Sequence, residues 1–519
     1  MMRFEVDPAA QPLRMPWKKG IAVGRAYELL REDLLGHLGK AQAEIGFSYC
    51  RFHGLFHDDM AVVHRKPDGT LVYQWHQVDK VLDALLRLGL KPFVELNPMP
   101  SALASGAQTM FFYKMNVTPP KDYKEWEDFV YAFAAHCAAR YGIQEVRSWY
   151  FEVWNEPNLG GFWSGTQAEY FELYRASAYG VRRVDPALRI GGPATSKASW
   201  ITDFIDYCSK NEVPVDFVST HLYPQDEYVE FPEPGTSPHA PGSFFKHTVR
   251  KAQVEVEASV YPELEVHWTE WNAMSADAGT SVQWLDNPTN DNLFAASFIV
   301  ENCLALDDAA DSFFFWVVSD VFEEAGFPLS PFSCTYGLLT VHGIPKASYN
   351  AFRLLSRLRG DRMEVARDGA GLAKGHTLFA TREAESTHLI AANHRPLEVA
   401  EQPELRHQVS VPAHGASEHL VVLERIRVGA GSAWETWVRM GRPQELSSAQ
   451  ERLLRQHAEP EMLCLRVPAN DGMVAFEIQA GPNEVVYAEI RALGASSVGK
   501  GSAASESALW DKLMGEKSR

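Results

Sequence analysis

The chain contains little cysteine and lacks a long hydrophobic run. Its six cysteines are spread over 519 residues, and no two stand at the Cys-x-x-Cys spacing of zinc ligands or redox pairs. No stretch of about 18 apolar residues is uninterrupted, so a membrane-spanning helix is not expected. The first residues, MMRFEVDPAAQPLRMPWKK, lack the apolar segment of a secretory signal. These absences predict a cytoplasmic protein without a metal site, a cofactor, a disulfide framework or a membrane span.

Positive charge is also scarce. There are 49 lysines and arginines against 67 aspartates and glutamates, which gives a formal net charge of −18. Because no basic block occurs, nucleic acids and anionic membranes are not expected as partners. The simplest role of the acidity is solubility.

Residues 14–358 alternate short apolar runs with helical patterns. Near-continuous apolar runs followed by helices are typical of parallel strands that are buried on both faces. Eight such units predict a closed (β/α)8 TIM barrel of the α/β class. An open doubly wound sheet is the alternative, but it would carry a GxGxxG loop after an early strand, and none occurs there. The eight runs are KGIAVG (19–24), FSYCRFHG (47–54), KPFVELN (91–97), SWYFEVWNEPN (148–158), RIGGPAT (189–195), VDFVSTHLYP (215–224), LEVHWTEWNA (264–273) and SFFFWVVSD (312–320).

The pattern changes after the barrel. Residues 359–493 contain alternating apolar runs separated by glycine, proline and polar turns, with no helix over most of their length. This predicts a C-terminal antiparallel β-sandwich. Residues 1–13 include the strand-like RFEV, which we expect to join that sandwich. Residues 494–519 contain the low-complexity GASSVGKGSAASES and are predicted to be a flexible tail.

Two of the barrel runs end in a glutamate. Glu156 closes the fourth run in FEVWNEPN, and Glu270 closes the seventh in HWTEWN. These strands are three apart on a ring of eight, so their carboxyl ends face each other across the mouth of the barrel. Such a carboxylate pair can act as general acid and nucleophile on an acetal, provided that their environments separate the two pKa values. A lone glutamate at a strand end is more often a salt-bridged rim residue, but a matched pair favours catalysis.

The neighbours of Glu156 raise a question of geometry. Pro157 is expected to restrict the backbone of Glu156 to an extended conformation, which would fix the direction of its side chain. In an ideal strand Asn155 and Glu156 point to opposite faces. A bulge or a turn would be needed to bring both into one site.

Other strand ends supply polar and aromatic groups. The period of two places Arg51 and His53 on one face of the second run, and His221 and Tyr223 on one face of the sixth. Arg51 can keep a neighbouring carboxylate ionised, as a nucleophile requires. Tyr223 is expected to donate to the nucleophile or to a sugar hydroxyl.

The eighth strand end adds Trp316 as a floor on which a pyranose can stack, followed by Glu323 and Glu324 as acceptors for sugar hydroxyls. Phe162 is predicted to line the sugar pocket. Glu95 and Asn97 end the third run, where a structural role and a binding role are equally compatible with the pattern. A single core histidine or tryptophan is commoner than a functional one, and the convergence at several strand ends is what favours a site.

Longer motifs resemble glycoside hydrolase family 39 of clan A, over the barrel and the trailing β-domain. The resemblance rests on the motifs WNEPN, THLYP, HWTEWN, FWVVSDVFEE and GLLTVHGIPKASYNAF (337–352). It implies that Glu156 is the acid/base and Glu270 the nucleophile of a retaining double displacement, and that Asn155 binds the sugar 2-hydroxyl. It further implies sugar-binding or nucleophile-supporting roles for His53, His221, Tyr223, Trp316 and one of Glu323 and Glu324. The peptide after Trp316 is often cis in such barrels.

The resemblance is strongest to β-D-xylosidases, which implies removal of single β-D-xylosyl units from the non-reducing ends of xylo-oligosaccharides in xylan degradation. α-L-Arabinosidase, β-glucosidase and endo-xylanase activities remain alternatives on the same scaffold. α-L-Iduronidase is less favoured, because its acidic substrate wants a cation and the strand ends offer only Arg51. A catalytically silent carbohydrate-binding protein is expected to have lost one glutamate, and both are present. The sequence leaves open whether the chain forms a homo-oligomer.

Overall fold

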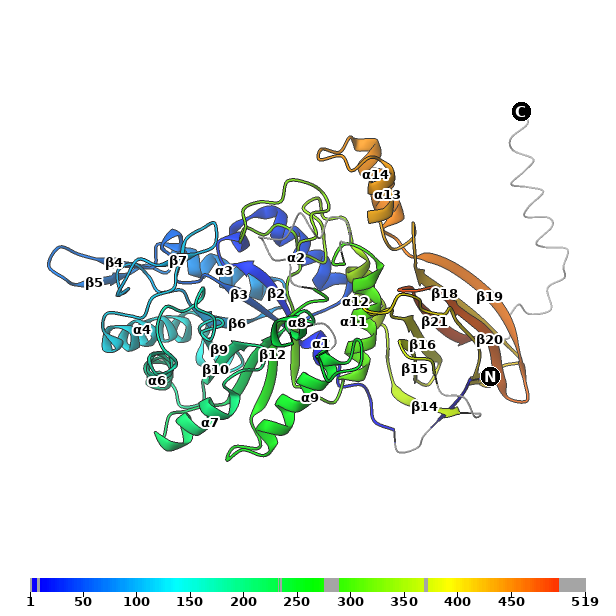
Figure 1. Cartoon of the computed structure of the whole chain (residues 1–519), viewed down its shortest axis with the longest axis horizontal. Helices are drawn as coiled ribbons and strands as arrows, with labels where there is room; N and C mark the ends of the chain where they lie inside the picture. Colours follow the sequence, from blue (N-terminus) through cyan, green and yellow to red (C-terminus); the bar gives the residue numbers. More distant parts are fainter. Residues whose placement is uncertain are drawn as a thin grey trace.

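The computed structural model describes residues 2–6, 10–231, 233, 236–274, 289–367 and 372–493. Figure 1 shows two parts side by side, a barrel coloured blue to green and a β-domain coloured yellow to orange. The tail predicted for residues 494–519 lies outside the described residues.

Eight parallel strands close into a barrel, which confirms the predicted TIM architecture. Each strand pairs with its neighbour along the chain, and the eighth pairs with the first. The strands are β2 (Gly20–Arg25), β3 (Tyr49–His53), β6 (Lys91–Leu96), β9 (Tyr150–Val153), β10 (Arg189–Ser196), β11 (Phe217–Leu222), β12 (Glu265–Trp271) and β13 (Ser312–Phe315).

Helices follow the strands and cover the outside of the barrel. In α3 the buried residues recur every three or four positions, as an amphipathic helix requires. Thr166 and Glu169 form a capping box that begins α6. The main helices are α2 (Glu32–Glu44), α3 (His76–Arg87), α4 (Tyr123–Tyr141), α6 (Gln167–Arg182), α7 (Ile201–Lys210), α9 (Phe244–Glu257), α11 (Leu293–Ala305) and α12 (Ala347–Leu355).

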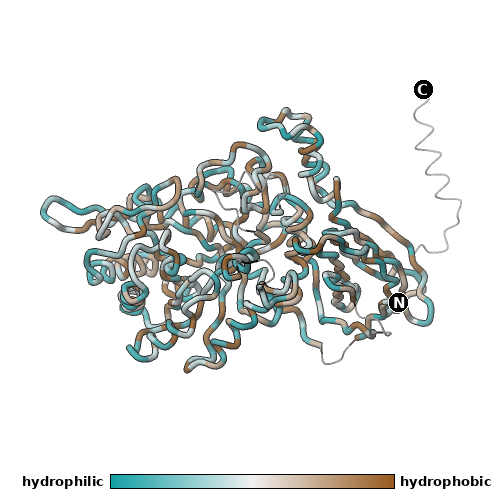
Figure 2. The backbone as a smooth tube through the Cα atoms, in the orientation of Figure 1, coloured by the Kyte–Doolittle hydropathy of each residue, from teal (hydrophilic) through white to brown (hydrophobic). Residues whose placement is uncertain are grey.

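Short elements decorate the loops. The tip of the β4–β5 hairpin projects at the far left of Figure 2, and it is hydrophilic and exposed. Among the described residues, no helix has the length and apolarity that crossing a membrane requires. The short elements are α1 (Pro16–Lys19), η1 (Glu28–Leu30), η2 (Asp58–Met60), β4 (Val63–Arg65), β5 (Leu71–Tyr73), β7 (Thr109–Met110), β8 (Met115–Asn116), α5 (Ile143–Val146) and α8 (Asp226–Glu230).

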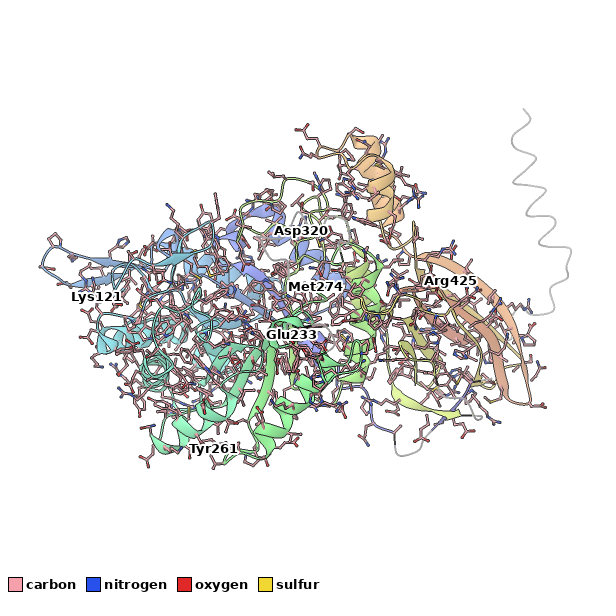
Figure 3. The ribbon with its side chains drawn as sticks, viewed as in Figure 1. Lys121, Glu233, Tyr261, Met274, Asp320 and Arg425 are labelled. Atoms are coloured by element: carbon pink, nitrogen blue, oxygen red, sulfur yellow. The ribbon has the colours of Figure 1, made fainter. Side chains whose placement is uncertain are left out.

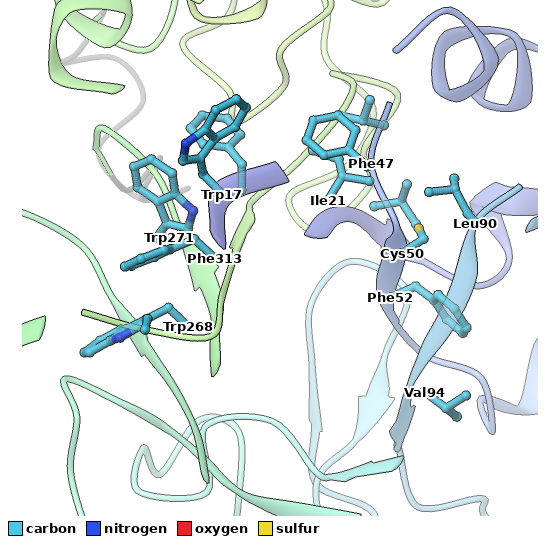
Figure 4. Close-up of a cluster of buried hydrophobic side chains, with 14 of the residues drawn as sticks. Trp17, Ile21, Phe47, Cys50, Phe52, Leu90, Val94, Trp268, Trp271 and Phe313 are labelled. Atoms are coloured by element: carbon cyan, nitrogen blue, oxygen red, sulfur yellow. The ribbon is translucent and has the colours of Figure 1, made fainter. Parts of the chain in front are cut away.

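Two sets of side chains pack the barrel. The set between strands and helices includes Trp268, Trp271 and Phe52, which Figure 4 shows among other buried apolar side chains. A separate aromatic layer comprises Phe93, Tyr150, Phe217 and Phe314. Within it, the rings of Phe93 and Phe314 are 4.8 Å apart. Glu95 and Glu152 stand two residues beyond Phe93 and Tyr150, so the period of two places polar groups directly above this apolar floor.

The second domain is a closed sheet of nine strands in which directions are mixed. Its pairs are antiparallel except for β1 with β17, which run parallel. The sequence predicts an antiparallel sandwich that the N-terminal strand joins; β1 is inserted between β14 and β17, where it closes the sheet and adds the one parallel pair among the described strands of this domain. The strands in spatial order are β1 (Met2–Val6), β14 (Asp361–Arg367), β15 (His376–Arg382), β16 (Ser386–Asn393), β21 (Val485–Ala492), β18 (Glu418–Ile426), β19 (Glu461–Asn470), β20 (Met473–Ala480) and β17 (Leu405–Pro412).

Between β18 and β19 the chain forms two helices, α13 (Trp434–Arg439) and α14 (Ser448–His457). Figure 1 shows them projecting above the β-domain. They pack on the loop after β13, where the rings of Phe332 and Trp437 are 5.4 Å apart. In Figure 3, Asp320 on this loop lies between Lys121 of the barrel and Arg425 of the β-domain along the long axis.

Candidate active site

The two glutamates that end strands four and seven lie side by side at the mouth of the barrel. One oxygen of Glu156, one oxygen of Glu270 and a ring nitrogen of His221 are all within 4.8 Å of one another. The glutamates are 6% and 7% exposed, and His221 is fully buried. Two carboxyl groups at this separation, in a largely dehydrated place, can act on the same bond.

A tight turn after β9 delivers Asn155 and Glu156 to the same site. Trp154 and Glu156 have positive φ angles of 69° and 45°, so the extended backbone predicted for Glu156 from its following proline is wrong. These two residues, in left-handed backbone conformation, turn the chain after β9. The Glu156 N–H donates to the Ala194 carbonyl oxygen at 2.8 Å. Such strained conformations persist only where neighbouring structure holds them. Here Trp154 is fully buried and donates from its indole to the Phe162 carbonyl oxygen at 2.9 Å.

Arg51 is the buried cation around which the acidic groups gather. Its guanidinium pairs with Glu95 and Glu152 at 2.6 Å each and donates to Glu270 at 3.3 Å. It also donates to the Asn155 side-chain oxygen at 2.9 Å. Although burial opposes the effect, Arg51 holds the pKa of the Glu152 carboxyl group below its usual value. The role predicted for Arg51, support of a neighbouring carboxylate, matches these contacts.

Glu270 accepts hydrogen bonds on both of its oxygens. The Tyr223 hydroxyl donates to one at 2.5 Å, and Arg51 donates to the other at 3.3 Å. Burial raises the pKa of Glu270, and Glu156 adds to this, while His221 and Arg51 oppose it. Donors on both oxygens favour the ionised form, which is the form that a nucleophile needs.

Glu156 has a different set of neighbours. Burial, helped by the nearby Glu95, raises its pKa to about 7 against the opposing charge of Arg51. Nδ1 of His221 lies 3.1 Å from one carboxyl oxygen of Glu156, and a hydrogen bond with the Ser196 side chain lowers the pKa of Glu156 somewhat. A carboxyl group with a pKa near neutrality is suited to general acid and base catalysis.

The tautomer of His221 follows from its contact with Arg51. A guanidinium nitrogen can only donate, so Arg51 makes Nε2 of His221 the acceptor at 3.3 Å. Burial lowers the pKa of His221 to about 4, so the ring is neutral and carries its proton on Nδ1, facing Glu156. Nδ1 therefore has no lone pair for a metal, and the Glu156–His221–Glu270 group suits proton transfer better than metal binding.

His53 has acidic neighbours at both of its ring nitrogens. Its Nδ1 lies 2.8 Å from a Glu95 oxygen, and its Nε2 faces Glu324 at 3.8 Å and Glu270 at 4.0 Å. Burial and Arg51 lower the pKa of His53 to about 3, so the ring is neutral. Glu95 is thus a partner of His53 and Arg51, and Asn97 accepts from the Gly54 N–H at 2.8 Å.

The consecutive residues Glu323 and Glu324 have separate positions. Glu323 pairs with Arg25 at 2.7 Å and with Arg31 at 3.5 Å, so it does not offer the free sugar acceptor that the sequence predicts. Glu324 faces His53, and burial together with Glu270 raises its pKa well above the usual value. Of the two, Glu324 is the one placed to meet a ligand.

Aromatic groups form the floor. Trp316 is fully buried against His53, with ring centroids 4.5 Å apart, and the Trp316–Val317 peptide is cis. Phe162 is half-buried and packs on Phe111 with ring centroids 5.4 Å apart, on the outer side of the turn. It therefore belongs to the rim.

Sequence reasoning missed three residues at the strand ends and one in the loop after β13. Arg25 ends β2 and pairs with Asp59 at 2.5 Å, so the statement that Arg51 is the sole strand-end cation is wrong. Lys197 follows β10 and lowers the pKa of Glu156 by its charge. Asn272 donates to the carbonyl oxygens of Trp316 and Tyr336, and the Tyr336 ring packs 6.0 Å from that of Tyr223. Extending the predicted runs by one or two residues would have found Arg25 and Lys197.

Comparison with known proteins gives consistent matches over most of the chain. The family described as glycosyl hydrolases family 39 matches residues 2–475. A "Beta-xylosidase" of Caldicellulosiruptor saccharolyticus is 37% identical over 482 residues, which cover 92% of this chain and 95% of that protein. A "Beta-xylosidase" of Geobacillus stearothermophilus is 36% identical, covering 91% and 92%. The solved structure of a "monomeric beta-xylosidase" from Caulobacter crescentus CB15 superposes with a TM-score of 0.82 at 32% identity, covering 95% of this chain and 99% of that one.

Proposed function

Because the chain belongs to glycoside hydrolase family 39, we propose that it is a retaining exo-β-D-xylosidase. It would release single β-D-xylosyl units from the non-reducing ends of xylo-oligosaccharides. The observation that carries the retaining mechanism is the 4.8 Å limit on the distance between the Glu156 and Glu270 oxygens. Retaining enzymes hold the two carboxyl groups about 5–5.5 Å apart, whereas inverting enzymes leave about 6.5–9.5 Å for a water molecule.

In the first step the ionised Glu270 attacks the anomeric carbon while Glu156 gives its proton to the leaving oxygen. The C–O bond to the leaving group breaks, and a covalent glycosyl–enzyme forms. In the second step the Glu156 carboxylate takes a proton from water, and the water oxygen displaces Glu270 from the anomeric carbon. Two inversions give net retention, and both glutamates return to their starting states.

The exchange of roles by Glu156 follows from the charge on its neighbour. In the resting site the Glu270 carboxylate disfavours a second negative charge within 4.8 Å. Once Glu270 becomes an ester this charge is gone, and the pKa of Glu156 falls. The same side chain that gives a proton in the first step can then accept one in the second.

The remaining contacts suit a neutral monosaccharide. Arg51 occupies the Asn155 side-chain oxygen, which leaves the Asn155 amide N–H groups free to donate to the sugar 2-hydroxyl. The Tyr223 hydroxyl gives its proton to Glu270 and can accept from a sugar hydroxyl, while Glu324, whose raised pKa favours the protonated form, can donate to one. The ring of Trp316 is buried against His53 in the same pocket. Arg25 and Arg51 are both paired with carboxylates, so neither of these two arginines is available to the carboxylate of an iduronate.

A polar hollow of about 490 Å³ is a candidate place for the leaving saccharide. It is lined in part by Asn158, which follows Glu156 by two residues in the sequence, and by Lys197, Glu230 and His247. Its polar lining suits the hydroxyl groups of further sugar units.

The sugar is tested by hydrolysis of p-nitrophenyl β-D-xyloside, β-D-glucoside and the α-L-arabinosides, with Glu270→Ala as control. The similarity to β-xylosidases supports the xyloside as the best substrate. One extra hydroxymethyl group changes binding by only about 1–3 kcal/mol, so weaker turnover of the other glycosides is expected. Faster turnover of another glycoside would reassign the sugar.

Exo action is tested separately by digestion of xylohexaose. Xylose and xylopentaose are expected as the first products. Early xylobiose or xylotriose would favour an endo-xylanase.

A further inference from the structure

Glu28 is a buried carboxyl group that the proposed mechanism does not use. It lies on η1, just beyond the end of β2, and is 1% exposed. Its described hydrogen bonds are with backbone: one oxygen accepts from the Glu323 N–H at 2.9 Å, and the other from the Arg25 N–H at 3.1 Å. Burial raises its pKa to about 8. Burying such a group is costly unless it is hydrogen-bonded, and both oxygens of Glu28 accept a hydrogen bond.

The surrounding chain makes room for this side chain. A Cβ atom at Gly24 would lie 2.5 Å from a Glu28 oxygen and 2.7 Å from the Phe322 ring. No real Cβ atom tolerates such distances, so glycine at position 24 allows Glu28 and Phe322 to approach the end of β2 together. Glu28 thereby joins the first strand end to the loop after the eighth.

The loop segment that Glu28 holds carries a ligand-facing group. Phe322 packs on Trp316, with ring centroids 6.0 Å apart, and the side chain of Glu323 pairs with Arg25 at 2.7 Å. The next residue, Glu324, faces His53 at 3.8 Å, and its carbonyl oxygen accepts from the Phe112 N–H at 2.8 Å. The N–H group from which Glu28 accepts a hydrogen bond therefore belongs to Glu323, the residue immediately before Glu324.

We propose that Glu28 is a positioning residue for sugar binding, which acts by fixing the backbone from which Glu324 reaches the substrate. This inference rests on the proposed glycosidase function. Arg25 and Arg31 hold the Glu323 side chain, and Glu28 holds its backbone, so the loop cannot rotate without breaking both. A loosened loop would displace Glu324 while leaving Glu156 and Glu270 in place.

A double-mutant cycle between Glu28→Gln and Glu324→Gln tests the proposal, with kcat/KM on p-nitrophenyl β-D-xyloside as the readout. Glutamine at position 28 keeps one acceptor and turns an N–H₂ group toward the other backbone N–H. The change leaves one buried backbone N–H without its acceptor, which predicts a fall of about tenfold in the wild-type background. In the Glu324→Gln background the same change is expected to cost less than about twofold, because the group that it positions is already altered.

A merely structural role would lower the amount of active enzyme equally in both backgrounds. Active sites are therefore counted by labelling Glu270 with an activated 2-fluoro-xyloside, and rates are expressed per active site. Gly24→Ala would disturb the same contact by pushing a Cβ atom against Glu28 and Phe322. Its loss in kcat/KM is likewise expected to be smaller in the Glu324→Gln background. Glu44 lies on the outer helix α2 and accepts a hydrogen bond from the Tyr349 hydroxyl. Glu44→Gln is the matched control and is expected to leave kcat/KM unchanged.

Equal losses in the two backgrounds, or no loss in Glu28→Gln, would overturn the positioning role. Absence of turnover of any glycoside by the unaltered protein would instead overturn the proposed function. The two failures are thus distinguishable.

Discussion

At the mouth of the barrel two glutamates with identical side chains have different hydrogen-bond partners. Glu270 receives donors from Tyr223 and Arg51, one on each oxygen. Glu156 faces the Nδ1–H of a neutral His221 and the side chain of Ser196, and burial in its site raises its pKa to about 7. The difference in surroundings allows one to remain an anion while the other holds a proton.

Substitution of the two glutamates is expected to have unequal effects. Glu270→Ala should lower kcat by at least about 10³-fold on every substrate, since no other group forms the glycosyl ester. Glu156→Ala should slow release of xylose from xylobiose by about 10²–10⁴-fold, the usual contribution of a general acid. Formation of the glycosyl–enzyme from p-nitrophenyl xyloside should change far less, because that leaving group needs little protonation. Equal losses on both substrates would contradict these assignments.

The pH dependence of kcat/KM on xylobiose should follow Glu156. Its pKa is raised to about 7, and the acid must be protonated to act, so activity should fall as pH rises through about 7. Lys197 lowers this pKa by its positive charge. Lys197→Met should therefore move the basic limb to higher pH, by about 0.3–0.5 unit for a partly screened charge.

Lys251→Met is the control for this shift, since Lys251 lines the same hollow and pairs at 3.6 Å with Glu255. Lys251→Met is expected to leave the basic limb of the pH profile unchanged. Identical profiles for the wild type and Lys197→Met would show that the lysine has no influence on the acid.

Among the loops, the one after β13 is fastened by a buried ion-pair group. Lys346, fully buried, pairs with Asp291 at 2.6 Å and with Asp320 at 2.7 Å. Those aspartates accept from the N–H groups of Cys334 and Gly337, on either side of Tyr336. The HGIPKASYNAF motif thus contributes a residue that fixes the aromatic wall behind Tyr223.

Lys346→Met should destabilise the protein by about 3–5 kcal/mol, because two buried carboxylates lose their counter-charge. Unfolding in urea measures this change. Lys40→Met removes a partly exposed pair with Glu44 and should cost no more than about 1 kcal/mol. Similar losses in the two variants would show that the buried group does not fasten the loop.

The barrel strands and several site residues could be predicted because their signals are local. Apolar runs mark the strands, and a period of two places Arg51 and His53 on one inward face. The left-handed backbone of Glu156 could not be predicted, since it is held by the Ala194 carbonyl oxygen on the next strand. Likewise, the division between Glu323 and Glu324 depends on Arg25, about 300 residues away in the sequence. Helix α14 could have been predicted, because a capping box of Ser447 and Gln450 marks its start in the sequence.

The hydrophobic core of the barrel extends into the β-domain, which also has a core of its own. The cluster around the barrel continues into Ile390, Ala392, Ile426, Val485 and Tyr487 of the β-domain. Strand β1, at the start of the chain, pairs with β14 and β17 of the same domain, so the chain passes from the β-domain to the barrel and back. Asn350 of α12 adds hydrogen bonds to the carbonyl oxygens of Gly431 and Ala458, at 3.0 and 2.7 Å.

Helix α11 shows why the barrel should not be stable alone. Nearly all of its residues are buried, because one side packs on the barrel and the other on β15, β16 and β21. A helix that is apolar all round needs cover on every side. A chain that ends at residue 358 would expose one of these faces, together with the parts of α12 that meet β18.

We therefore expect the intact protein to unfold in a single calorimetric transition, with a van't Hoff enthalpy equal to the calorimetric one. The chain truncated after residue 358 is expected to aggregate, or to remain in solution without a cooperative transition and without glycosidase activity. The truncation leaves Arg51, Glu156, Glu270 and every other proposed site residue in place, so loss of activity would trace to the missing cover of α11 and α12. Two separate transitions in the intact chain, or an active truncated barrel, would mean that the shared core does not couple the two parts.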